Sequence, residues 1–82
     1  MNKPPPKYLV VIEKGPRSFG AFVPDLPGCV AVGKTAREVR RLIREAIELH
    51  LLDMRERGDS IPKPSASIDY VAAQNGRRKR AA

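Results

Sequence analysis

The sequence contains too little cysteine and histidine for covalent or metal cross-links. Cys29 is the only cysteine and His50 the only histidine in 82 residues. A single cysteine excludes an intrachain disulfide. One cysteine and one histidine are also too few for a structural zinc site, which has four ligands. A domain this short buries only about 60% of the surface of its unfolded chain. We therefore expect self-association, as a dimer or a dimer of dimers, to supply further stability.

Long apolar runs are also missing. The longest, Tyr8–Ile12, is far shorter than the roughly 20 residues that cross a bilayer. Residues 1–7 are a proline-rich lead-in without the apolar stretch of a secretory signal. These features predict a cytoplasmic protein with no membrane partner.

The basic charge belongs to the ends of the chain. Residues 8–71 hold ten Lys or Arg and all nine acidic residues, which leaves +1 of the total of +7. The other six positive charges are on Lys3, Lys7 and the run Arg77, Arg78, Lys79 and Arg80. This run is suited either to sequence-independent phosphate contacts or to a solubilising end. It has no interleaved aromatic residue on which bases would stack, so specific single-strand recognition is not expected.

Three strands are predicted before the helix, over residues 8–12, 18–23 and 29–32. The first is apolar at every position, which is typical of a strand covered on both faces. Gly and Pro in 13–17 and 24–28 predict the connections. The first connection is so short that the first two strands should be antiparallel.

The helix is the clearest prediction. Thr35 is an N-cap candidate, Glu38 completes a capping box, and Gly58 fits the residue after the last turn. Such a helix would be roughly 33 Å long. Between the caps, apolar residues recur every three or four positions and give a broad apolar face: Val39, Leu42, Ile43, Ala46, Ile47, His50, Leu51 and Met54.

Residues 66–72 alternate weakly and predict a fourth strand. The order is therefore β-β-β-α-β, an α+β fold, and the crossover helix makes the last strand parallel to a neighbour, most simply residues 8–12. One helix covers one face of the sheet, so we expect a second copy to cover the other. Residues 73–82 are predicted to be a basic, disordered tail.

Four arginines share one side of the first half of the helix. They are either a solvated face, paired with Glu38, Glu45 and Glu48, or a contact surface for RNA or an acidic partner. These residues are Arg37, Arg40, Arg41 and Arg44.

Catalysis is not predicted. Two-metal chemistry needs several carboxylates close to paired ions, and the candidates have local roles instead. Asp25, between two prolines, is expected to bond nearby N–H groups of its own turn. His50 is expected to be a packed or interface residue and Cys29 a core residue. No metal, cofactor or catalytic residue is therefore assigned. The candidate carboxylates are Glu13, Asp25, and Glu48 or Asp53.

Several stretches together resemble the HicB-type antitoxins of bacterial toxin–antitoxin pairs. The more specific ones are Gly20–Cys29 (GAFVPDLPGC) and Gly58–Ser65 (GDSIPKPS). They are joined by Tyr8–Glu13 (YLVVIE), Gly33–Thr35 (GKT) and Glu45–His50 (EAIELH). The resemblance is dense over residues 8–65 and looser to 72, so we take 8–72 as a HicB-like antitoxin domain.

The resemblance implies a truncated RNase H-like fold with strand order 3-2-1-4. It also implies a partner, a HicA-type toxin, which is a small basic mRNA-cleaving protein that the antitoxin occludes. Many members carry a DNA-binding domain after this region. This sequence ends soon after Val71, so we expect a short form with at most weak, nonspecific nucleic-acid binding. The alternative is a stand-alone nucleic-acid-binding protein that uses the basic tail and the helix arginines.

Overall fold

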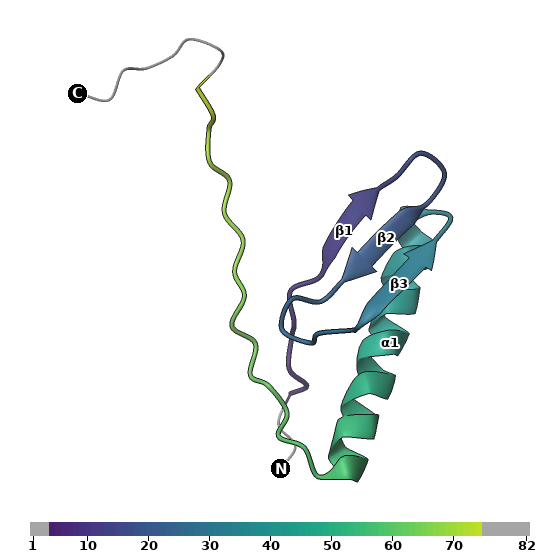
Figure 1. The fold of residues 1–82 in the computed structure, drawn as a ribbon. Coiled ribbons are helices and arrows are strands. Elements are labelled where there is room, and N and C mark those ends of the chain that lie inside the picture. Colours follow the sequence, from purple (N-terminus) through teal and green to yellow (C-terminus); the bar gives the residue numbers. More distant parts are fainter. Residues whose placement is uncertain (1–3, 75–82) are drawn as a thin grey trace, which may run out of the picture.

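The computed structural model describes residues 4–74. Three strands precede one long helix: β1 (Val11–Lys14), β2 (Phe19–Phe22), β3 (Val30–Gly33) and α1 (Ala36–Arg57). The strands form an antiparallel sheet in the order β1-β2-β3. Helix α1 lies across one face of this sheet (Figure 1). The α+β class with a single helix on one face is confirmed.

The strand register sorts side chains onto two faces. Ile12, Ala21 and Ala31 are aligned in one row across the sheet, and this row points toward α1, where Ala21 is buried. Because side chains alternate along a strand, the neighbouring rows point away from the helix. The core is thus a single layer between sheet and helix. Its buried members are Ala21, Val23, Leu26, Cys29, Val39, Ile43 and Leu51.

Both helix caps form as predicted. The Thr35 hydroxyl accepts a hydrogen bond from the Glu38 N–H at 3.0 Å, while the Glu38 carboxylate accepts from the Lys34 N–H at 2.6 Å. At the other end Gly58 has a φ of 79°, a conformation that glycine adopts without a steric penalty. The N–H groups of Gly58 and Asp59 donate to carbonyls of the last helical turn, which satisfies groups that a helix end leaves unpaired.

The first strand differs from its prediction. It starts at Val11, and its four residues are half-buried or exposed, so the prediction of a strand over 8–12 covered on both faces is wrong. The strand also forms an edge of the sheet. Val11 pairs with Phe22, and continuing the ladder would bring the chain opposite Pro24. Proline has no N–H to donate, so the pairing stops there. Tyr8 and Val10 still pack against the core.

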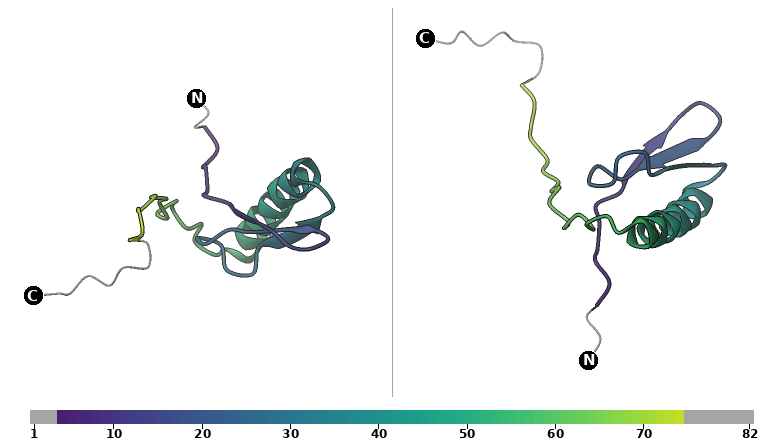
Figure 2. Two further views of the ribbon diagram at one scale, coloured as in Figure 1. Left: turned by 90° about the horizontal axis from the view of Figure 1, so that it is seen from above. Right: turned by 60° about the horizontal axis from the view of Figure 1, so that its bottom comes forward.

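The predicted fourth strand is not formed either. Residues 59–74 contain no regular structure, so the order 3-2-1-4 is not present in this chain by itself. After residue 66 the chain runs away from the sheet (Figures 1 and 2). In the single chain the larger apolar side chains of residues 66–72, which are Ile68, Tyr70 and Val71, are all exposed. The Cα radius of gyration is accordingly 17.1 Å, against about 12 Å for a compact domain of this size.

Within residues 4–74, no helix combines the length and apolarity needed to cross a membrane.

The junction of β3 and α1 depends on Gly33. A Cβ on this residue would lie 2.8 Å from the Val39 backbone nitrogen, and neither backbone segment can yield easily. Gly33→Ala should therefore lower the free energy of unfolding by about 1–3 kcal/mol in urea titrations followed by circular dichroism. Gly20→Ala is the matched control, because its Cβ would meet nothing within 4 Å. Equal stability of the two variants would contradict this packing.

Candidate binding surfaces

The sheet presents a largely apolar surface on the side opposite α1. Val30 and Val32 are 62% and 66% exposed and Phe22 is 39% exposed. Glu13 is the one charged residue among the strand positions of this surface. An apolar surface of this kind on a small protein is typical of a protein-interaction site. We call it the outer sheet face, and its residues are Val11, Glu13, Gly20, Phe22, Val30 and Val32.

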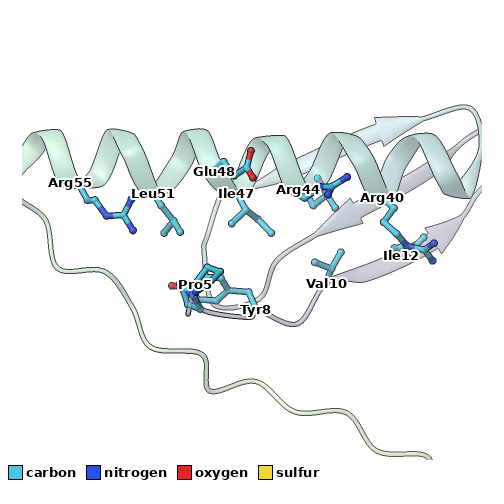
Figure 3. Close-up of a pocket in the computed structure, with 12 residues that line it drawn as sticks. Pro5, Tyr8, Val10, Ile12, Arg40, Arg44, Ile47, Glu48, Leu51 and Arg55 are labelled. Carbon is cyan, nitrogen blue, oxygen red and sulfur yellow. The ribbon is translucent and has the colours of Figure 1, made fainter. Parts of the chain in front are cut away.

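A groove of about 870 Å³ lies between α1 and the segment that leads into β1. Figure 3 shows helix side chains along one side and Tyr8, Val10 and Ile12 along the other. Apolar side chains of α1, including Ile47 and Leu51, line the groove with these three. We call it the β1 groove. Three arginines accompany the apolar lining: Arg40, Arg44 and Arg55.

The β1 groove runs beside an unpaired strand edge. Within residues 4–74, strand β1 bonds to β2 on one side only, so alternate residues direct their N–H and C=O groups away from β2. The groove therefore combines an apolar lining with free backbone donors and acceptors. That combination is suited to an added strand.

The carboxylate of Asp25 fastens the chain that follows the helix. It accepts hydrogen bonds from the Ser65 N–H and hydroxyl, both at 2.9 Å, and from the Ala66 N–H at 3.1 Å. We call this arrangement the Asp25 clamp. The expectation that Asp25 bonds N–H groups of its own turn is wrong, because its partners lie 40 and 41 residues along the chain.

A second contact holds the same region. The Tyr8 hydroxyl donates a hydrogen bond to the Pro62 carbonyl at 2.5 Å. Burial, together with the negative charge of Asp25, raises the pKa of Tyr8, so this hydroxyl keeps its proton. Residues 62–66 are thereby fixed beside the start of β1.

The candidate catalytic residues are dispersed. Glu13 lies on the outer sheet face and Asp25 in the clamp, while Glu48 lines the β1 groove. Asp53 forms an ion pair with Arg57. Within residues 4–74 there is no group of three side chains with metal-ligating chemistry.

Cys29 and His50 are placed near one another. Cys29 is buried in the core, as predicted, and its burial raises the pKa of the thiol. His50 is partly buried and lines a hollow of about 440 Å³ together with Cys29 and Asp53. A thiol with a raised pKa carries little thiolate, so it is poorly suited to nucleophilic chemistry.

The helix arginines do not form one uniform surface. Arg41 pairs with Glu45 at 3.1 Å, whereas Arg40 and Arg44 line the β1 groove. Arg37 is exposed in the first turn. Whether these arginines are a solvated face or a contact surface stays a prediction. The other predicted nucleic-acid contacts lie outside the described residues: Arg77, Arg78, Lys79 and Arg80.

Sequence reasoning missed the clamp and the β1 groove. The clamp joins segments far apart in sequence, and no local pattern links Asp25 to Ser65. The groove exists because β1 is an edge strand, which the all-apolar run had argued against. The outer sheet face had a signal in the alternation of Val30 and Val32, and the register was needed to align it with Val11 and Phe22.

The model of a HicB-like antitoxin of bacterial toxin–antitoxin systems matches residues 8–79. The chain belongs to this family. The resemblance seen in residues 8–72 is thus confirmed. Since an antitoxin acts by binding, membership speaks against a catalytic role.

Curated relatives of this HicB-like chain come from bacteria, archaea and a phage. A UPF0150 protein of Helicobacter pylori is 54% identical over 54% of this chain and 61% of its own length. A UPF0150 protein of Thermoplasma acidophilum is 36% identical over 82% of this chain and 99% of its own. An uncharacterized protein of Haemophilus phage HP1 is 34% identical over 78% of this chain and 48% of its own. The chain thus spans about half to two-thirds of the phage and Helicobacter relatives. No solved structure matches it.

The Asp25 clamp should respond to acid. Three hydrogen bonds lower the pKa of Asp25, and the one from the Ser65 N–H has the largest effect. They do so because they favour the ionised carboxylate. The clamp is therefore complete above the unfolded pKa of about 3.9 and is lost as the pH falls through the lower folded pKa. In a pH titration followed by NMR, the Ser65 and Ala66 amide signals should shift with a midpoint below 3.9.

Asp25→Ala should abolish that inflection, and Asp69→Ala is the matched control that should preserve it. A midpoint at or above the ordinary aspartate value, or an inflection that survives in Asp25→Ala, would contradict the clamp.

Proposed function

We propose that this protein is an antitoxin that neutralises a HicA-type, mRNA-cleaving toxin by binding it through the outer sheet face. Family membership supports an antitoxin role. The choice of this surface is supported by the exposure of Phe22, Val30 and Val32 on a sheet side that no helix of the described residues covers. Burying about 400 Å² of apolar surface there would contribute on the order of 10 kcal/mol before the costs of association.

Charge also favours the outer sheet face over the helix. A toxin that binds RNA is basic, and Glu13 is the charge that the strands offer on this face. The first half of α1 carries Arg37, Arg40, Arg41 and Arg44 instead. Like charges facing one another across an interface oppose binding. Electrostatic repulsion therefore disfavours binding of the toxin at α1 and leaves the side of the sheet away from α1 as the more favourable surface.

The four-stranded, RNase H-like order 3-2-1-4 belongs to the same proposal. Residues 66–72 would become a strand on β1 in the assembled protein, although they do not form one in the single chain. Self-association, expected from the small core and from the uncovered sheet face, is also part of the proposal. Here the outer sheet face is assigned to the toxin, so a second copy is placed elsewhere.

Neutralisation should depend on the outer sheet face. The variant Val30→Glu with Val32→Glu should weaken binding to a HicA-type toxin encoded beside this gene at least about 30-fold, because it places two charges at the centre of an apolar interface. Cells that co-express toxin and variant should stop growing. Isothermal titration calorimetry measures the affinity. Leu52→Glu is the matched control, because Leu52 is exposed on α1. Equal neutralisation by both variants would contradict the proposed surface.

A stand-alone nucleic-acid-binding role has less support, because Arg41 is paired with Glu45 and Arg40 and Arg44 line the β1 groove. We expect only weak, sequence-independent binding to DNA or RNA, with a log–log salt slope no steeper than about −4. Removing residues 76–82 should abolish most of it. Fluorescence anisotropy on promoter and scrambled DNA tests this, and nanomolar preference for the promoter would favour the alternative.

A further inference from the structure

We propose that residues 66–72 of one copy of this chain form the fourth strand on β1 of a second copy, and that two copies exchange these segments reciprocally. The inference rests on the fourth strand proposed above and adds which chain supplies it. It does not depend on the identity of the toxin.

The acceptor is the edge of β1 together with the β1 groove. An edge strand with free N–H and C=O groups is a template for pairing with another chain. The groove beside it extends along α1 from Arg40 to Arg55, which at 1.5 Å per residue is about 22 Å. Residues 66–72 as a strand would measure about 20 Å. Length and hydrogen-bonding capacity therefore match.

The donor has the pattern of a strand with one apolar face. Ala66, Ile68, Tyr70 and Ala72 alternate with residues that would face the other way. In the structure Ile68 and Tyr70 are 65% and 89% exposed. A tyrosine ring suits the groove, because its ring can pack on apolar side chains while its hydroxyl reaches the water-exposed arginines.

In the single chain residues 66–74 run away from their own β1 edge (Figures 1 and 2), and this path is the reason for choosing a second copy over closure onto the same chain. The Asp25 clamp and the Tyr8–Pro62 hydrogen bond fix the root of the segment. Pro62 and Pro64 fix φ on either side of Lys63 and keep this connection extended. From that root the segment runs outside the groove of its own chain (Figures 1 and 3). The described residues therefore hold both an anchored extended segment, residues 66–72, which we call the arm, and an unpaired β1 edge that could receive one.

Two such molecules complement one another about a two-fold axis. Each copy donates residues 66–72 to its partner and receives the same segment in return. Both β1 edges are then paired, and no such segment in the dimer is left unpaired. The outer sheet face is not used, and it stays available to a toxin. Exchange of an element between identical copies is a low-cost route to a dimer, because the contacts are supplied by existing sequence.

A photocrosslink at the arm tests the exchange in the full chain. With Tyr70→p-benzoyl-phenylalanine, irradiation should give a covalent dimer whose adduct maps to β1 or to α1 residues of the groove. A mixture of isotope-labelled and unlabelled protein identifies adducts between two copies by mass. The same probe at Val71, on the opposite side of the arm, is the matched control and should give far less groove adduct. Adducts within one copy, or adducts on the outer sheet face, would overturn the proposal.

Sedimentation supplies an independent readout. Ile68→Ser with Tyr70→Ser should weaken the dimer at least about 30-fold, with the helical circular dichroism signal unchanged because the arm lies outside the core. Val30→Glu with Val32→Glu should leave the dimer intact even though it removes toxin binding. A monomeric wild-type protein at micromolar concentration, or a dimer that only the second variant disrupts, would refute the exchange. Failure of toxin neutralisation alone would refute only the proposed function.

Discussion

The packing of one helix against one face of a three-stranded sheet determines the rest of this structure. Val39, Ile43 and Leu51 of α1 contribute buried side chains to the core, and the residues opposite them come from β2 and the β2–β3 connection. A single helix cannot reach the other face of the sheet or the space beyond β1. Both surfaces remain uncovered for that geometric reason. We propose that the toxin binds the outer sheet face and that a second copy binds at the β1 edge.

These two open surfaces differ in the kind of recognition that they offer. The outer sheet face carries apolar side chains and one carboxylate. Its affinity for a partner would therefore depend mainly on shape complementarity and buried apolar area. The β1 groove adds backbone hydrogen bonding, which selects for an extended chain irrespective of most side chains. A small protein can therefore keep a self-interaction and a partner interaction separate without enlarging its core.

Local sequence patterns predicted the helix and its caps, because Thr35, Glu38 and Gly58 act on neighbouring backbone groups. The strand over 18–23 was also recovered, since turn residues bound it on both sides. The errors concern relations between distant segments. The apolar run at Tyr8 indicates burial, and it does not reveal that Pro24 ends the ladder. Asp25 looks like an ordinary turn residue until Ser65 is brought beside it. The weak alternation of 66–72 indicates that these residues can form a strand. It does not indicate whether the strand edge with which they pair belongs to the same chain or to a second copy.

The Asp25 clamp has a further consequence for a chain that contains one cysteine. By joining Asp25 to Ser65 and Ala66, it closes a loop that includes β3 and the entire helix. In small secreted domains loops of this length are commonly closed by disulfides, which restrict the unfolded chain permanently. Here the closure exists only in the folded state and consists of charge-assisted hydrogen bonds near the surface. The loop can therefore be opened and closed again without any redox chemistry, which makes the mounting of residues 66–72 a reversible feature of the fold.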